Sequence, residues 1–475
     1  MSPTAELVAQ PTAPPPPSVE LPRLPFERAA ETLRSGGMPR IRSNAGDWPR
    51  TTRVLPWMLA AFIAILWLVP FNSIGLTVSL PIDLKFDRLV LPVIAGVWFL
   101  SLAVGGPGSP RLRVTPIHLA IGAFVAICFL SVVADAHYLN VTLELDTAIK
   151  KLTLVVSYAL VFVMIASVVR RTEVRAFMIY TLVLAVICAL GIIWEYRFKF
   201  NVFYVWSDKL LPGIFHVALF DPSGVDEIGR RQTRGPAELG LEAAAMLAMA
   251  MPIAFVGVMH ATRTRDRILY ALAACVLLAA AVSTYRKTAF LAPISVVLTL
   301  AFFRRRELLK LAPLAVVGVL GIHALSPGAI GAITDQFSGS RLSAAQTVND
   351  RTSDYDAIRP DVWSHLALGR GFGSYEQTLY RILDSEVLHR LVEIGVIGLI
   401  AYLMMMVAVV VTVSPIIRGR DPAYAPLALA AAGAAVAYLT VSTLFDALSF
   451  PHTPYIFLTF AAFAAVLVKP PEEAT

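Results

Sequence analysis

Long apolar stretches alternate with short polar ones along most of this chain, and one long polar block interrupts the alternation. A membrane-spanning helix needs about 20 mostly apolar residues to cross a hydrocarbon core roughly 30 Å thick. Windows of this kind lie at 54–71, 88–106, 115–134, 152–169, 175–194, 236–259, 267–283, 288–303, 309–325, 391–413, 424–445 and 453–468. The pattern predicts about twelve spans, within a range of eleven to thirteen because the windows from 267 to 325 are closely spaced.

The spans are predicted to be helices, which makes the chain an all-α integral membrane protein. Backbone groups in lipid must be satisfied internally, so only helices and closed barrels cross a membrane. The apolar runs are continuous rather than alternating, which favours helices over barrel strands. With 57% hydrophobic residues, 15% charged residues and a mean hydropathy of +0.69, the composition excludes a soluble globular protein.

The polar segments divide the chain into five parts. Residues 1–50 are polar and proline-rich without a cleavable signal pattern, so we expect a disordered cytoplasmic tail. Nine helices follow in 51–325, then a large extracytoplasmic loop at 326–390, three helices in 391–468 and a short cytoplasmic tail at 469–475. The three cysteines all lie inside predicted spans, so we expect small core residues rather than a disulfide or a metal site.

The distribution of charge sets the predicted orientation. With twelve spans and the N-terminus inside, the inner segments carry 22 Lys and Arg against 11 Asp and Glu, and the outer segments carry 18 against 22. Basic residues favour the cytoplasmic side, so both termini are predicted there, in a multi-pass protein of the cytoplasmic membrane. The pI near 9.3 then reflects topology, and no nucleic-acid partner is expected.

Three predicted outer segments carry arginine in positions that suggest an anionic ligand. Arg234 lies just before Pro236 at a predicted helix start, Arg286 and Lys287 share a very short turn, and Arg359 lies in the large loop. Guanidinium groups match phosphate oxygens in a bidentate manner. Arginines near helix ends also commonly reach towards water or lipid phosphates, and that alternative stays open for each of them.

The end of the polar block carries the candidate acid–base residues. Asp384 or Ser385 fits an N-cap before a helix in which Glu386 and His389 share a face. A carboxylate here suits a general base for a sugar hydroxyl, although capping alone also accounts for Asp384.

Two further features of the same region are predicted to support the site. Gly371 and Gly373 belong to a glycine-rich turn that is either structural or substrate-cradling, and it lacks the spacing of a nucleotide fingerprint. Glu393 lies in an apolar run, where an ionisable residue usually has a partner; Arg286 or Arg234 is a possible one. The remaining outer charges around Lys150 fit a solvated interfacial helix, and His216, His323 and His452 show no metal-ligand spacing.

Taken in order, these segments resemble the O-antigen ligase and polymerase superfamily of multi-span, GT-C-type membrane glycosyltransferases, over roughly residues 54–468. Arg234-Gly235-Pro236 looks like the first arginine segment of the family, and Ser283-Thr284-Tyr285-Arg286 looks like its Ser-Arg turn. Arg359 with Trp363, followed by the glycine-rich turn, looks like the stretch that leads into the active site. The run from Leu391 to Leu399 is similar to the family's L-x-E-x-G-x-x-G opening and is the most specific of the four.

The resemblance implies inverting transfer of a glycan from a polyprenyl-diphosphate carrier to a glycan or lipid acceptor, without metal or nucleotide. It also implies a flippase or a chain-length protein as a further partner. The matching arginines would hold the diphosphate leaving group. One position departs from the ligases, which usually carry a His-Asn pair nine residues before the glutamate of the Glu-x-Gly run. Asp384-Ser385 stands here instead, which makes Asp384 the first choice of base, with Glu386 and His389 as alternatives.

Two other classes of protein fit the same sequence. A transporter or flippase for an anionic or lipid-linked substrate would carry charges near mid-span, for which Glu242 and Glu393 are candidates. A structural scaffold of the envelope would tolerate neutralisation of the charges in the outer loop. The sequence leaves open the sugar, the linkage and the acceptor.

Overall fold

The computed structural model describes most of the chain between residues 46 and 468. The described residues are 46–77, 85–106, 109–218, 233–313, 316, 320, 346–376, 379, 380, 383, 385–419 and 421–468. All of them belong to one compact unit. The predicted tails at 1–50 and 469–475 therefore lie almost entirely outside the described residues, as does the first part of the predicted outer loop.

The described part of the chain is an all-α membrane protein, as predicted. Nine of its helices are long and apolar enough to cross a membrane. They are α3 (Phe86–Val104), α4 (Pro116–Ala134), α6 (Leu145–Val168), α7 (Val174–Phe198), α9 (Gly240–His260), α10 (Thr264–Ser283), α11 (Thr288–Leu308), α16 (Glu386–Gly419) and α17 (Ala425–Ser442). Two shorter apolar helices, α2 (Val54–Leu68) and α18 (His452–Val468), coincide with the first and last predicted windows. The window 309–325 lies largely outside the described residues, so the count of twelve spans stays a prediction.

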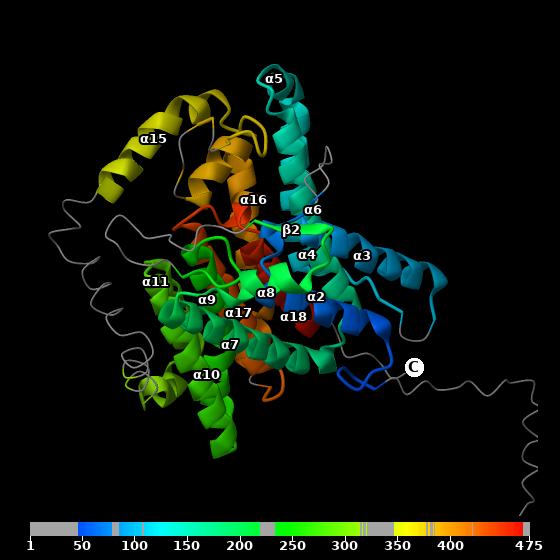
Figure 1. Cartoon of the computed structure of the whole chain (residues 1–475), viewed down its shortest axis with the longest axis vertical. Coiled ribbons are helices and arrows are strands. Elements are labelled where there is room, and N and C mark those ends of the chain that lie inside the picture. Colours follow the sequence, from blue (N-terminus) through cyan, green and yellow to red (C-terminus); the bar gives the residue numbers. More distant parts are fainter. Residues whose placement is uncertain are drawn as a thin grey trace, which may run out of the picture. The chain divides into compact units, whose positions relative to one another are not determined.

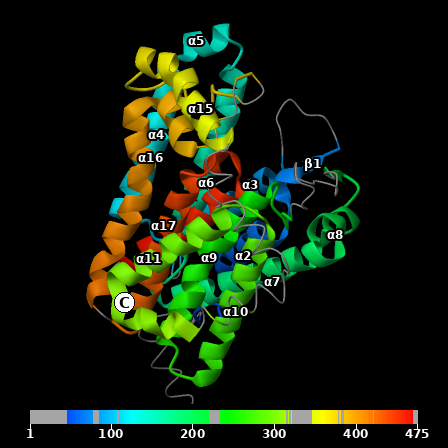
Figure 2. The same cartoon turned by 90° about the vertical axis from the view of Figure 1, so that its left-hand side faces the viewer.

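Other elements connect these helices. They are α5 (Ala136–Val141), α8 (Val202–Leu210), α15 (Gln346–Ser364) and the 3₁₀ turns η1 (Phe71–Ser73), η2 (Arg171–Glu173), η3 (Leu309–Leu311) and η5 (Ala447–Ser449). The sheet among the described residues is one antiparallel pair, β1 (Ile74–Leu76) with β2 (Phe215–Val217), in which Ile74 faces Val217. Figures 1 and 2 show α5 and α15 at one end of this unit, here called the loop end, and the tip of α10 at the opposite, far end.

Helix α9 forms the centre of the bundle and packs against α7, α10, α11, α17 and α18. Its sequence is rich in alanine and methionine, and nearly all of it is buried. A Cβ added at Gly433 of α17 would lie 2.9 Å from Cβ of Pro252 in α9, so the two helices approach closely there. Small residues allow such contacts, which replace the hydrophobic effect as the source of helix association in lipid.

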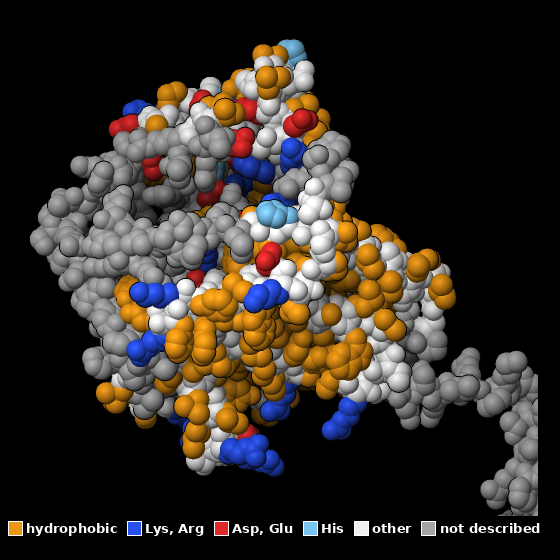
Figure 3. Space-filling view, in the orientation of Figure 1, with side chains coloured by type: hydrophobic (Ala, Val, Ile, Leu, Met, Phe, Trp, Pro, Cys, Tyr) orange, Lys and Arg blue, Asp and Glu red, His pale blue; other side chains and the backbone are white. Residues whose placement is uncertain are grey.

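The outer helices present apolar side chains to the surroundings. On α3, Val93, Phe99, Leu100 and Val104 are all more than half exposed. Figure 3 shows hydrophobic side chains in a broad band across one face, with Lys and Arg along its lower edge at the far end. An exposed apolar band of this kind fits contact with lipid acyl chains rather than with water.

Three predictions about individual segments can be compared with the structure. Helix α16 begins at Glu386 rather than at 391, because its first two turns carry ion-paired residues that lower the local hydropathy. The predicted helix start next to Ser385 is thereby confirmed. Helix α9 begins at Gly240, four residues after Pro236. Cys128, Cys188 and Cys275 are free and buried, as predicted.

Candidate functional site

Five buried ionisable residues gather at the loop end, and we call them the charged cluster: Glu386, His389, Arg390, Glu393 and Asp446. The first four occupy one face of the first two turns of α16, since residues three and four apart on a helix are neighbours. Asp446 lies between α17 and α18. Every member is at most 3% exposed. Burial of this kind is costly unless each charge has a partner.

Arg390 is the centre of the cluster. Its Nε lies 2.6 Å from Oε1 of Glu386, and its Nη1 lies 2.7 Å from Oε2 of Glu393. Asp446 Oδ1 is 3.9 Å from the third nitrogen, Nη2. Lys151 of α6 approaches Glu393 from outside, with Nζ 3.7 Å from Oε1. The three acidic side chains are thus surrounded by Arg390, Lys151 and the imidazole of His389.

His389 has an acceptor at each ring nitrogen. Its Nδ1 lies 2.9 Å from Oδ2 of Asp446, and its Nε2 lies 3.2 Å from the carbonyl oxygen of Tyr375. Both nitrogens therefore face acceptor oxygens, and neither presents a lone pair to a substrate. Burial would raise the pKa of Asp446, but His389, a hydrogen bond with Glu386 and the charge of Arg390 hold it well below its ordinary value. The geometry describes a closed ion-pair network.

The glycine-rich turn positions Glu393 through its backbone. Gly395 breaks the ideal geometry of α16 with φ +63°, and the carbonyls of Val392 and Glu393 accept from the N–H groups of Arg370 and Gly371, each at 3.0 Å. A Cβ on Gly369 would lie 2.2 Å from the carbonyl carbon of Glu393. Only glycine allows this approach of two backbones at positive φ.

Gly371 and Gly373 serve the same turn from its other side. Both have positive φ, at +108° and +82°. A Cβ on Gly371 would lie 2.9 Å from Leu139 of α5, and one on Gly373 would lie 2.9 Å from the Cα of Ala148 in α6. Both glycines therefore let the turn pack against α5 and α6. This packing explains why glycine occupies the two positions without a role in holding substrate.

Arg370, between Gly369 and Gly371, joins three segments of the loop end. Its guanidinium lies 3.3 Å from Glu144, which precedes α6, and 3.3 Å from Asp361 of α15. It also donates to the hydroxyls of Tyr138 (3.1 Å) and Tyr380 (2.6 Å). At 2% exposed, Arg370 links α5, α15 and the turn from inside the protein.

The segments that carry Arg234 and Arg286 lie side by side. The hydroxyl of Thr233 donates to the carbonyl of Ser283 at 3.0 Å. A Cβ added at Gly240 would lie 2.8 Å from the carbonyl oxygen of Thr233 and 3.4 Å from that of Thr284. The structure thus joins two of the three predicted arginine segments. Arg359 is exposed on α15, and among the contacts of the described residues none joins it to the other two.

Tyrosines and one glutamate shape this pair of segments, which we call the arginine turns (233–240 and 283–288). The carboxylate of Glu195 accepts from the backbone N–H groups of Arg234 (3.2 Å) and Gly235 (2.8 Å). The Arg234 guanidinium lies 5.4 Å from the ring centre of Tyr204. Tyr285, at φ +56°, shares a 2.7 Å hydrogen bond with the hydroxyl of Tyr196. Arg234, Arg286 and Lys287 are half-buried.

A second buried histidine–carboxylate pair lies next to the arginine turns. Glu242 Oε1 is 2.9 Å from Nδ1 of His452, and Nε2 of His452 lies 3.3 Å from the carbonyl oxygen of Val69. Glu242 also accepts from the backbone N–H of Glu238 at 2.9 Å. Glu238 is half-buried and accepts from Asn72 at 2.6 Å. Burial, and then the charge of Glu242, raise the pKa of Glu238.

An apolar groove begins at the Arg286 turn. It has a volume of about 550 Å³ and runs between α9, α10 and α11. Val282, Ala289 and Phe290 line it beside the turn, and Leu308 and Leu311 line it near η3. Basic side chains therefore stand near both ends of this groove, with Arg286 and Lys287 in the turn at the loop end and Arg305 among the lining residues near η3.

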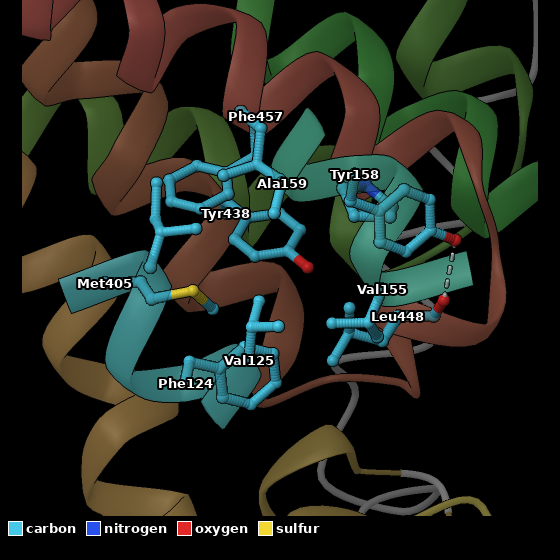
Figure 4. A pocket seen from close by; sticks show the side chains of 12 residues that line it. Phe124, Val125, Val155, Tyr158, Ala159, Met405, Tyr438, Leu448 and Phe457 are labelled. Carbon is cyan, nitrogen blue, oxygen red and sulfur yellow. Dashed lines mark hydrogen bonds between the residues drawn. The ribbon is translucent and has the colours of Figure 1, made fainter. Parts of the chain in front are cut away.

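A smaller pocket lies within the bundle beside Leu448 in the connection between α17 and α18 (Figure 4). Its volume is about 20 Å³, and it is lined by apolar side chains of α4, α6, α16, α17 and α18. Tyr158 points its hydroxyl at the carbonyl of Leu448, 3.3 Å away, and Tyr438 stacks on Phe457 with ring centres 4.4 Å apart. The space holds about one water and offers almost no polar partner, so it does not serve as a substrate site.

The predicted site residues therefore separate into several groups. Arg234, Arg286 and Lys287 belong to the arginine turns, whereas Glu386, His389 and Glu393 belong to the charged cluster. Asp384 lies outside the described residues. The partner expected for Glu393 was Arg286 or Arg234; the structure gives it Arg390 and Lys151 instead, because Arg390 is three residues away on the same helix face.

Asp446, His452 and Arg370 were not predicted as site residues. A single acid in the short apolar connection after Phe445 is a signal that could have indicated Asp446, since ionisable residues at such positions usually have a partner. His452 lies in a similar position and was interpreted as unremarkable. Its pairing with Glu242, 210 residues away, has no local signature.

Comparisons with known proteins leave the family open. No family model matches the chain, and no curated protein matches it at a significant level.

Proposed function

We propose that this protein is a membrane glycosyltransferase that transfers or polymerises glycan units carried on polyprenyl diphosphate, at the outer face of the cytoplasmic membrane. The observation that carries the proposal is the position of the arginine turns at one end of the apolar groove. A lipid diphosphate needs cations for its head group and an apolar channel for its tail. The two features adjoin at Arg286.

The arginine turns would act on the leaving group. The acceptor hydroxyl attacks the anomeric carbon, the bond from that carbon to the diphosphate oxygen breaks, and the diphosphate leaves with an added negative charge. Arg234, Arg286 and Lys287 would stabilise that charge in a half-buried site, where such contacts are stronger than in water. The proton of the acceptor hydroxyl passes to a carboxylate.

Two carboxylates, Glu238 and Asp384, are candidates for that proton. Glu386 and His389 are less suitable, because Glu386 is enclosed in the charged cluster and both ring nitrogens of His389 face acceptors. Glu238 is half-buried, stands four residues after Arg234 and has a raised pKa, as a general base working near neutral pH requires. Asp384 remains the candidate from the family resemblance. The proposal therefore places the base at Glu238 or Asp384.

The proposal is tested with the protein's own donor. Lipid-linked glycans that accumulate in a deletion strain are extracted and incubated with the purified protein in liposomes. We expect longer glycan chains, or glycan on a second lipid, together with free polyprenyl diphosphate. Arg286→Gln should lower the rate by at least tenfold, since a charge-assisted hydrogen bond contributes about 1.5–3 kcal/mol.

Arg265→Gln is the matched control, because Arg265 is exposed at the far end of α10. Equal rates of glycan transfer by the Arg286→Gln and Arg265→Gln variants would show that Arg286 does not bind the diphosphate. If the unaltered protein leaves the lipid-linked glycan donor intact, the glycosyltransferase proposal itself is wrong.

One observation favours a transporter instead. The break in α16 at Gly395, together with buried ionisable residues in α9 and α16, is typical of the discontinuous helices of transporters. A transporter would move the lipid-linked glycan to the other leaflet with its glycosidic bonds intact. The same liposomes distinguish the two functions, if the donor's accessibility to an added glycosidase is followed alongside chain length.

A further inference from the structure

A small polar pocket lies at the far end, at the opposite end of α6 from the charged cluster. It has a volume of about 60 Å³. Its lining comes from three separate segments, and consists of Arg53, Ser109, Arg111, Ser167, Val168, Val169 and Arg170. Three guanidinium groups and two hydroxyls therefore face one space, and the apolar contribution is minor.

A buried carboxylate arranges this pocket. Glu173 is 0% exposed. Its Oε1 is paired with the Arg53 guanidinium and accepts from the backbone N–H of Trp48 at 2.8 Å, and its Oε2 accepts from the backbone N–H of Arg170 at 2.9 Å. Arg53 also donates to the carbonyl of Val168 at 3.4 Å. The Arg53 guanidinium and the backbone of Arg170 are thus held in place before any ligand binds, which lowers the entropic cost of binding.

The charges of the pocket are only partly compensated. Arg53 is paired with Glu173, and Arg170 lies 3.7 Å from Asp47. Arg111 is exposed, its backbone N–H donates to the carbonyl of Ser167 at 3.1 Å, and its side chain forms no ion pair with the described residues. One positive charge therefore remains next to two guanidinium groups that each have an acidic partner.

We propose that this arginine pocket binds a phosphate group. Planar guanidinium forks match phosphate oxygens, so the three arginines supply the donors that a phosphate requires. A water needs roughly 10–15 Å³ of such space, so a pocket of about 60 Å³ has room for several waters or a small anion. The pocket lies where α2 and α4 begin and α6 ends. If these apolar helices span the membrane, their ends bring the pocket to the level of the lipid head groups. In the orientation expected from charge, it faces the cytoplasmic leaflet, where basic pockets between helices bind anionic lipids.

The phosphate is carried either by an anionic phospholipid or by a free anion, and the experiment distinguishes them. The purified full-length protein is placed in nanodiscs of phosphatidylcholine, with and without phosphatidylglycerol, and separately in phosphatidylcholine with inorganic phosphate. Thermal unfolding is followed in each, and retained phosphatidylglycerol is counted by native mass spectrometry. A rise in the unfolding midpoint with phosphatidylglycerol alone assigns the site to a lipid, and a rise with inorganic phosphate alone assigns it to a free anion.

Arg111→Gln and Arg113→Gln form a matched pair, because both remove one charge from the same connection and only Arg111 lines the pocket. We expect Arg111→Gln to weaken phosphate binding about tenfold, and Arg113→Gln to change it less than twofold. Arg111→Lys should give an intermediate affinity, since it keeps the charge and loses the fork. Equal binding by the two glutamine variants, or no stabilisation by either ligand, would overturn the proposal. The result is independent of whether the protein transfers glycans.

Discussion

The charged cluster and the arginine turns are both rich in ionisable residues, but they differ in what surrounds each charge. In the cluster, Arg390 faces three carboxylates and every member is almost fully buried. In the arginine turns, Arg234 and Arg286 are half-buried beside tyrosines and an apolar groove. The number of charges therefore does not locate a substrate site. What distinguishes the arginine turns is partial accessibility beside an apolar groove, which makes them the proposed binding region.

The largest expected effect separates the two regions by activity. Glu238→Gln should lower the rate of glycan transfer about 10²–10⁴-fold if Glu238 is the base, since this is the usual contribution of general base catalysis. Glu238→Asp should recover part of the rate. The chain-length assay in liposomes measures both, and donor binding by Glu238→Gln should stay near that of the unaltered protein.

Asp384→Asn provides the comparison for that experiment. If Asp384→Asn removes transfer and Glu238→Gln keeps it, the base lies in the segment before α16 and the role given to Glu238 is wrong. A pH–rate profile sharpens the result, because loss of the base removes the rise in rate on the acidic side.

The next effect concerns stability. Arg390→Gln leaves three buried carboxylates without their main partner, and loss of one member of a buried ion pair costs about 3–5 kcal/mol. We expect a strongly lowered midpoint of thermal unfolding in detergent. Arg286→Gln, which lies in the half-buried arginine turns, should shift the midpoint only slightly. If both variants shift the unfolding midpoint by similar amounts, the charged cluster is not more important for stability than the arginine turns, and the proposed distinction between the two regions is wrong.

A glycine pair tests how the cluster is positioned. Gly369→Ala should destabilise the protein by roughly 1–3 kcal/mol or more, because the added Cβ meets the backbone of Glu393 at a positive φ. Gly105→Ala is the matched control. Gly105 has a similar φ of +67° but open space around it, so it measures backbone strain alone. The difference between the unfolding midpoints of the two variants measures how much of the destabilisation by Gly369→Ala comes from the steric clash. Equal midpoints would mean that the turn can move away from α16.

The smallest expected effect is a dependence on pH. The folded pKa of Asp446 lies well below its unfolded value near 3.9, so its charged form stabilises the folded state. This contribution is complete above about pH 5 and is lost as the pH falls through the folded pKa. Asp446→Asn should therefore be most destabilising at pH 7, with the difference from the unaltered protein narrowing below about pH 4. A difference that stays constant between pH 7 and pH 3 would contradict the assigned ionisation.

The helices could be predicted because lipid imposes a simple rule on length and polarity. Continuous apolar runs locate α4 and α17, for example, within a few residues. The same rule failed at the start of α16, since hydropathy treats Glu386, Arg390 and Glu393 as exposed charges and cannot register that they neutralise one another.

The candidate site could be predicted only where its chemistry is local in sequence. Arg234 and Arg286 were recognised from their own turns, although the contact between the turns depends on the packing of α9 with α10. The pairing of His452 with Glu242 and of Asp446 with His389 joins distant helices. No periodicity along the chain encodes such contacts.

The pairing of α16 with Asp446 also has a consequence for how the chain is made. The first two turns of α16 leave the ribosome with their ionised side chains well before Asp446 has been synthesised, 53 residues after Glu393. Isolated in lipid, these side chains would be expensive to insert. We therefore expect the start of α16 to stay in a hydrated or partly inserted position until the connection between α17 and α18 supplies Asp446, the partner of His389. Folding of this end of the protein would then depend on its last two helices.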